Sequence, residues 1–252
     1  MISRGGPIIL TQVENEYGSY GSDHSYMRAI HRILQKAGFD GIFYTADGAA
    51  VMQGGILPGL IPAINFGTYA QARAEFTKRL EIRPDGPLIC GELWGGWFDH
   101  FGETHANMPI EPLIESLKWM LDNQCSFSFY MLHGGTSFGF SAGANFQPDS
   151  HFAPDISSYD YDAILDEAGR PTAKYHAVKK LFQKYIPSKN FPPLPNPEKA
   201  IHIPRFKLTE SAPLHQLASQ AIPAEEPQTL EALGHTHGLM LYRSRQELTL
   251  TG

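Results

Sequence analysis

Short apolar runs alternate with amphipathic segments along most of this chain, and that alternation limits the possible folds more than any other feature. The apolar runs lie at residues 7–16, 41–46, 63–67, 87–94 and 126–132, and the helical patterns lie at 23–37, 68–80, 111–121 and 171–186. A repeated strand–helix order is typical of a parallel sheet with crossover helices. Because the runs are apolar on both faces, we expect a barrel or a doubly wound sheet.

The composition shifts once, in a proline-rich stretch near residue 190. Five prolines fall within the thirteen residues Pro187–Lys199, which favours a stiff, extended linker. Beyond it, residues 200–210 and 239–250 resemble strands, and no convincing long helix is indicated. We therefore predict an α/β domain at residues 1–187, a linker at 188–198 and the start of a β-rich domain at 199–252.

Charge and hydropathy exclude several classes of protein. The formal net charge is −6, from 20 Lys and Arg against 26 Asp and Glu, which disfavours nucleic acid as a partner. No apolar run reaches the roughly 18 residues that a membrane span needs. Cys90 and Cys125 are too few for a disulfide framework, and residues 1–10 lack the apolar region of a signal peptide. The sequence indicates no oligomeric state.

Glutamates stand where two of the apolar runs end. Glu14 and Glu16 close the first run, and strand alternation would put both side chains on one face unless the strand ends there and the backbone turns. Glu92 closes the run at 87–94, with Trp94 and Trp97 directly behind it. Two carboxyl groups beside aromatic rings suit glycoside hydrolysis, in which one protonates the leaving oxygen and the other attacks or activates water. The alternative is that they are solvated acids, although a carboxylate directly after an apolar strand is expected to be partly desolvated.

Two other motifs suggest different chemistry. Residues 133–139 contain G-x-S-x-G around Ser137, the pattern of an esterase nucleophile, but the residues that follow lack helical periodicity. His235 and His237 form an H-x-H that could bind metal, although a pair flanked by glycines is more typical of a polar loop. The sequence has neither a Walker A pattern nor a strand-linked G-x-G-x-x-G. We therefore expect no metal site and no organic cofactor.

Four motifs, taken in order, resemble glycoside hydrolase family 35, the β-galactosidases. They are QVENEYGSYG (12–21), GELWGGWFDHFG (91–102), YMLHGGTSFGF (130–140) and SYDYDAILDEAGRPTAKY (158–175). The resemblance implies an α/β fold of the (β/α)8 TIM barrel type, of which this chain would hold only strands 4 to 8, followed by the beginning of an all-β domain. It also implies that Glu16, on strand 4, is the acid/base and that Glu92, on strand 7, is the nucleophile.

The same resemblance implies a substrate and the residues that bind it. The activity would be that of a retaining exo-β-galactosidase, which removes terminal β-linked galactose from an oligosaccharide or glycoconjugate without metal or cofactor. Asn15, Tyr130 and Tyr161 would contact the sugar, while Trp94 and Trp97 would wall the pocket. Family members suggest a secreted, periplasmic or lysosome-like compartment, although this chain shows no signal peptide.

The resemblance begins at strand 4, so the family's strands 1 to 3 are not represented in the chain. Five strands of eight cannot close a barrel, and their free edges would invite aggregation. We therefore expect a fragment of a larger enzyme. The alternative function is a truncated, catalytically inactive chain that retains at most weak galactoside binding.

Overall fold

The computed structural model describes residues 1–67, 71–146, 152–187, 191–196, 199, 201–213, 216 and 221–245. The chain divides into two units. The first comprises residues 1–136 and 158–193, and the second comprises residues 137–157 and 194–252. Each is described below by itself.

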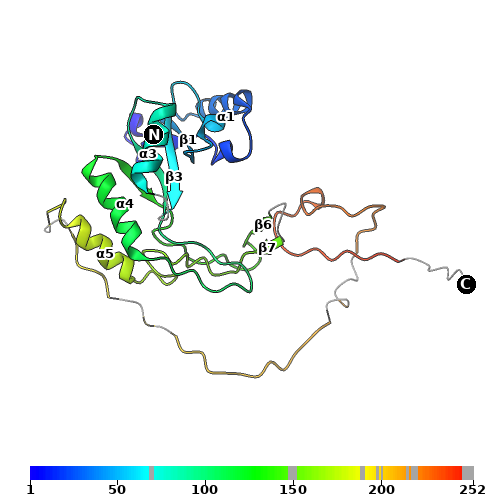
Figure 1. Ribbon diagram of the computed structural model, residues 1–252. Helices are drawn as coiled ribbons and strands as arrows, with labels where there is room; N and C mark the ends of the chain where they lie inside the picture. The colour runs from blue at the N-terminus through cyan, green and yellow to red at the C-terminus, as the bar shows by residue number, and fades with distance from the viewer. Residues whose placement is uncertain are drawn as a thin grey trace, which may run out of the picture. The chain divides into compact units, whose positions relative to one another are not determined.

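A five-stranded parallel sheet forms the centre of the first unit (Figure 1). Its strands lie in chain order and are β1 (Leu10–Gln12), β2 (Ile42–Gly48), β3 (Ile61–Gly67), β4 (Ile89–Trp94) and β5 (Ser126–Phe129). Each strand overlaps one of the five predicted apolar runs, so the predicted parallel sheet is confirmed. The sheet curls into half of a barrel, which confirms the partial TIM barrel.

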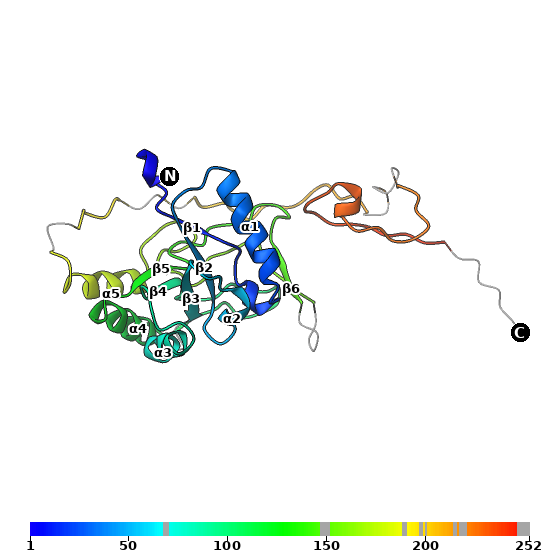
Figure 2. The same cartoon turned by 90° about the horizontal axis from the view of Figure 1, so that it is seen from above.

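Helices cover the outer face of this curled sheet. They are α1 (His24–Lys36), α2 (Met52–Gly55), α3 (Ala72–Ile82), α4 (Ile110–Asp122) and α5 (Ala173–Phe182). Figure 2 shows α3, α4 and α5 side by side along the sheet, and α1 beside β1 and β2. Two short 3-10 helices, η1 (Ile2–Arg4) and η2 (Tyr17–Ser19), flank β1.

The main core lies between the sheet and the row α3, α4 and α5. Phe66 of β3 and Leu93 of β4 pack there with Phe76, Leu117 and Leu181 of the three helices. Each such side chain contributes about 1.5–3 kcal/mol when it leaves water. The outer face of the sheet is therefore fixed by apolar packing, and the polar residues of β3 and β4 are left for the inner face.

Helix α1 begins where the helical pattern at 23–37 predicts, and its buried face agrees in part with the predicted one. Asp23 is the N-cap, and its carboxylate accepts hydrogen bonds from the backbone N–H groups of Ser25 (2.7 Å) and Tyr26 (3.2 Å). The apolar spacing at 23–37 predicts a buried face of Tyr26, Ile30, Ile33, Leu34 and Ala37. Ile30 and Leu34 do pack on the core, but Tyr26 and Ile33 are exposed and Met27 is buried. Met27 packs in one cluster with Val13 and Phe43, next to Ile30 and Leu34.

The second unit contains a short antiparallel pair, β6 (Ala144–Phe146) and β7 (Phe152–Pro154). In the described part of residues 199–252 the structure has one 3-10 helix, η5 (Glu231–Leu233), and no strand. The strands expected at 200–210 and 239–250 are therefore not formed at residues 201–210 and 239–245; residues 200 and 246–250 lie outside the described residues. A strand needs a hydrogen-bonded neighbour and a buried face, whereas Ile201, Ile203 and Leu239 are exposed. The β-rich domain and the linker boundaries remain predictions.

Among the described residues, no helix is both long and apolar enough to cross a membrane.

Candidate active site

The carboxyl ends of the parallel strands form one rim of the sheet, and both candidate glutamates lie there. Glu16 follows β1 by four residues, and Glu92 lies in the last half of β4. In a parallel barrel this rim is the end at which catalytic residues gather. Glu16, Glu92 and the residues that surround them all belong to the first unit.

The backbone after β1 turns sharply and separates Glu14 from Glu16. β1 ends at Gln12, and both glutamates have left-handed backbone conformations, with φ of 60° and 52°. The predicted strand alternation therefore does not apply to them. The carboxylate of Glu14 accepts a hydrogen bond from the Tyr26 hydroxyl of α1, whereas that of Glu16 accepts one from Nδ2 of Asn65 in β3, at 3.0 Å. Only Glu16 joins the inner face of the sheet.

Asp47, at the end of β2, holds the turn that follows Glu16. Its Oδ1 accepts the backbone N–H of Gly18 at 2.7 Å, and the side chain is buried. Burial raises the pKa of Asp47, the Gly18 hydrogen bond lowers it, and the charge of Glu16 raises it. A Cβ at Gly18 would lie 2.3 Å from the carbonyl oxygen of Val51, so this close approach requires glycine.

A shift in strand register turns Glu92 toward Glu16. Ile64 pairs with Cys90, but the next residue, Asn65, pairs with Glu92, so Gly91 is an extra residue in β4. Cys90 and Leu93 both pack in the outer core, although strict alternation would put them on opposite faces. Such a bulge re-aims the side chain that follows it. Glu92 therefore shares the inner face with Asn65 instead of entering the core.

Two neighbours set the electrostatic environment of Glu92. Burial raises its pKa, the hydrogen bond from Nε1 of Trp94 to Oε2 (2.9 Å) lowers it, and the negative charge of Glu16 raises it. The last effect means that Glu16 lies close enough to Glu92 to influence its ionisation.

Aromatic side chains form a wall beside Glu92. Trp97 lies edge-on to Trp94 at 5.6 Å between ring centroids and 6.1 Å from Tyr161, which in turn lies 5.7 Å from Tyr130. Tyr161 is only 2% exposed, whereas Trp97 is 38% exposed. Burial and the hydroxyls of Tyr159 and Tyr130 raise the pKa of Tyr161, as do the two glutamates. Trp97 is therefore the ring with most surface left for a ligand.

The other two predicted sugar contacts have different surroundings. Asn15 is exposed, and its Oδ1 accepts a hydrogen bond from Nε2 of Gln12 at 2.8 Å. The hydroxyl of Tyr130 lies 3.3 Å from that of Tyr159. Tyr130 thus belongs to the aromatic wall, while Asn15 lies on the turn that carries Glu16.

Lys174, which sequence reasoning did not single out, ties together the loops that carry Trp97 and Tyr161. From α5, its buried ammonium donates to the carbonyl of Gly95 (2.7 Å) and to both the carbonyl and the carboxylate of Asp162 (2.6 Å each). A Cβ at Gly96 would lie 1.8 Å from the carbonyl oxygen of Tyr161, so the two loops are in direct contact. The sequence signal is faint, because lysine is usual in a helix.

Asn65 was also missed, although the sequence offers a signal. It is the single amide in the apolar run at 63–67, and a polar side chain inside such a strand needs a partner. The structure shows that partner to be Glu16.

The geometry around the G-x-S-x-G motif and the H-x-H motif supports neither alternative. Ser137 is followed by a turn and by β6, not by the helix that a nucleophile elbow needs. Nδ1 of His237 lies 3.0 Å from the Thr236 hydroxyl. Within the described ranges, no group of three His, Cys, Asp or Glu side chains is placed to hold a metal ion.

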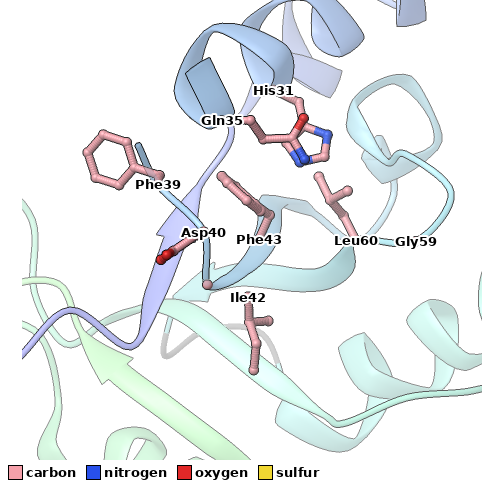
Figure 3. Close-up of a pocket in the computed structure, with 9 residues that line it drawn as sticks. His31, Gln35, Phe39, Asp40, Ile42, Phe43, Gly59 and Leu60 are labelled. Carbon is pink, nitrogen blue, oxygen red and sulfur yellow. The ribbon is translucent and has the colours of Figure 1, made fainter. Parts of the chain in front are cut away.

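A cavity of about 340 Å³ lies at the other end of the sheet, beside the amino end of β2 (Figure 3). His31 and Gln35 of α1 line it together with Phe43 and Leu60, and the His31 ring lies edge-on to Phe43 at 4.4 Å. In a TIM barrel the amino ends of the strands serve stability, and the chemistry lies at the opposite rim.

The comparison with known proteins bears on the pair of strand-end glutamates. The model of "Glycosyl hydrolases family 35" matches residues 1–185. The chain belongs to glycosyl hydrolase family 35. This confirms the resemblance drawn from the four motifs, and the match includes Glu16, Asn65 and Glu92.

Individual relatives match almost the whole chain. It is 43% identical to "Beta-galactosidase" from Xanthomonas manihotis, over 98% of this chain and 41% of that protein. It is 36% identical to "Beta-galactosidase" from Homo sapiens (97% and 37%) and 35% identical to "Beta-galactosidase-1-like protein 3" from Mus musculus (95% and 38%). The chain thus spans about two fifths of the length of these relatives.

Proposed function

We propose that these residues act in a retaining exo-β-galactosidase, with Glu92 as the nucleophile and Glu16 as the acid/base. One observation carries the proposal: Asn65 of β3 donates a hydrogen bond to Glu16 and is the backbone register partner of Glu92, so both glutamates lie around one strand position at the rim. The names of the relatives support galactose as the sugar.

The reaction proceeds by two displacements. The Glu92 carboxylate attacks the anomeric carbon and forms a C–O bond, while the glycosidic bond breaks and its electron pair, with the proton of Glu16, goes to the leaving oxygen. Water then attacks the same carbon, gives a proton to the Glu16 carboxylate, and the electron pair of the ester bond returns to Glu92. Two inversions retain the anomeric configuration, and neither step needs a metal or an organic cofactor.

The surrounding residues divide the remaining tasks. Trp94 holds Glu92 by its indole N–H, and Trp97 offers an apolar ring face to galactose. Tyr130 and Tyr161 contribute hydroxyl groups near the reacting centre, and Asn15 binds a sugar hydroxyl from the turn before Glu16. A terminal β-galactosyl residue on an oligosaccharide or glycoconjugate is the proposed substrate.

The test is hydrolysis of 4-nitrophenyl β-galactoside by the purified chain and by a polypeptide extended to the length of its relatives. Glu92→Gln should abolish at least about 99% of kcat in the active form. Glu115→Gln, an exposed carboxylate on α4, is the control and should keep full activity. Equal loss in Glu92→Gln and Glu115→Gln, or undiminished activity in Glu92→Gln, would overturn the assignment.

Comparison of the two polypeptides also tests the alternative function, a chain that binds galactosides weakly without hydrolysing them. If the chain is inactive but binds galactose weakly, and only the longer polypeptide hydrolyses the substrate, the chain alone is a binding remnant. If both hydrolyse it equally per mole, the five strands described here suffice.

A further inference from the structure

Asn65 is linked to both glutamates from β3, a strand that carries neither of them. It comes from β3, is 2% exposed, donates Nδ2 to Oε1 of Glu16 at 3.0 Å, and pairs in register with Glu92. We propose that Asn65 is a positioning residue, which fixes the carboxyl group of Glu16 for proton transfer. This inference rests on the proposed function.

The other half of the Asn65 amide argues against a purely structural role. Its Oδ1 is buried without a hydrogen-bond partner, and an unpaired buried acceptor is destabilising. An apolar side chain of the same size would avoid that cost. The amide is therefore retained for what Nδ2 does, which is to donate to Glu16.

The orientation of the amide follows from the charge of its partner. If the group were flipped, Oδ1 would face an oxygen of Glu16, and two acceptors would repel each other whenever Glu16 is ionised. Asparagine also adds no charge between the two glutamates. It can thus orient the Glu16 carboxylate without adding a negative charge that would favour protonation of either glutamate.

Gly91 provides the space for this arrangement. A Cβ at Gly91 would lie 2.8 Å from Oδ1 of Asn65 and 3.1 Å from Cβ of Ala46. The extra residue that turns Glu92 inward is therefore also the one that allows the Asn65 amide to fit. An alanine there would push Asn65 away from Glu16.

Kinetics with two substrates separates positioning from folding. Asn65→Leu should lower kcat/KM at least about tenfold for lactose, whose leaving group needs a proton, but less than about threefold for 2,4-dinitrophenyl β-galactoside, whose leaving group does not. Gly91→Ala should reproduce this split. The melting temperature of Asn65→Leu should not fall, because the variant removes an unpaired acceptor. Equal losses for both substrates together with a lower melting temperature would overturn the proposal.

The conservative variant adds a pH readout. In Asn65→Asp the side chain can donate to Glu16 only while its own carboxyl is protonated. The basic limb of the lactose profile should therefore move to lower pH, with activity recovered at acidic pH. An unchanged profile would contradict the role of the Nδ2 donor.

A titration of the purified chain by NMR needs no turnover. The side-chain amide protons of Asn65 should shift with pH, and this shift should disappear in Glu16→Gln. Asn123, whose Nδ2 donates to the Trp119 carbonyl, is the control and should not respond. If the Asn65 signals respond identically in Glu16→Gln, the positioning role is wrong; if they depend on Glu16 while no polypeptide hydrolyses galactosides, the proposed function fails and the contact stands.

Discussion

Trp94 donates its indole N–H to Oε2 of Glu92 at 2.9 Å, and this hydrogen bond opposes the effect of burial on the same carboxyl group. Removing it in Trp94→Phe should raise the pKa of Glu92, because burial and Glu16 then act without opposition. A nucleophile must be ionised, so the acid limb of the pH profile of kcat/KM should move to higher pH.

The measurement is the pH profile of 4-nitrophenyl β-galactoside hydrolysis by the active form. At pH values well above the limb, activity should change little, since Glu92 is ionised in both proteins. An acid limb that stays in place, or moves to lower pH, would show that the Trp94 contact does not govern Glu92.

Trp97 and Trp119 should respond in opposite ways to replacement by alanine. Trp97 is partly exposed beside the candidate site, so Trp97→Ala should weaken inhibition by galactose about fivefold, which corresponds to about 1 kcal/mol, with little change in melting temperature. Trp119 stacks on Phe76 at 5.6 Å in the core, so Trp119→Ala should destabilise the fold by about 3 kcal/mol and leave inhibition unchanged. A change confined to melting temperature in Trp97→Ala would make that ring part of the core instead.

Lys174 should be one of the most sensitive positions in α5. Lys174→Met leaves the Asp162 carboxylate and the Gly95 carbonyl without their shared donor, and breaking a buried pair in this way costs about 3–5 kcal/mol. Urea denaturation measures the loss, and Lys180→Met, on the exposed side of the same helix, is the control. Equal stability of the two variants would mean that Lys174 does not hold the loops.

His105 makes the stability of the same loops depend on pH. Its ring nitrogens lie 2.5 Å from Asp99 and 3.3 Å from Asp160, and the Asp99 hydrogen bond, followed by the nearby carboxylates, raises its pKa above the ordinary value of 6.5. Because the folded value is the higher one, the stabilisation is complete below about pH 6.5 and is lost as the pH rises through the folded pKa.

Thermal melts of the wild type and His105→Gln between about pH 5 and pH 9 test this dependence. The wild type should be the more stable protein at acidic pH, and the difference should vanish at alkaline pH. His202→Gln, an exposed position in the second unit, is the control. A stability difference that grows with pH would have the opposite sign and would show that the raised pKa of His105 is not its cause.

The sequence alone predicts the sheet well, because apolar runs between helical patterns indicate directly which segments are buried strands. It also singles out Glu14, Glu16 and Glu92, since a carboxylate at the end of an apolar strand is unusual; the choice of Glu16 over Glu14 came from the family resemblance, and the catalytic roles stay a prediction. It does not predict the register shift at Gly91, which depends on packing against β3. Nor does it predict that Tyr161 is buried or that Lys174 faces inward, because both depend on contacts between loops far apart in the chain.

The β-rich region illustrates a different limit. Alternation near residues 200–210 favours strands, but a strand is stable only beside another strand and over a core. Ile201 and Ile203 contact neither in the described residues, so local pattern and structure disagree there.

Trapping of the covalent intermediate tests the central claim most directly. A 2-deoxy-2-fluoro-β-galactosyl fluoride has a good leaving group and a fluorine that slows both displacements, so the glycosyl-enzyme should accumulate in the active form. After digestion, mass spectrometry should place the fluorosugar on Glu92, and Glu92→Gln should take up no label. A label on Glu16 or on any residue other than Glu92, or turnover of galactosides without any labelling, would contradict the account.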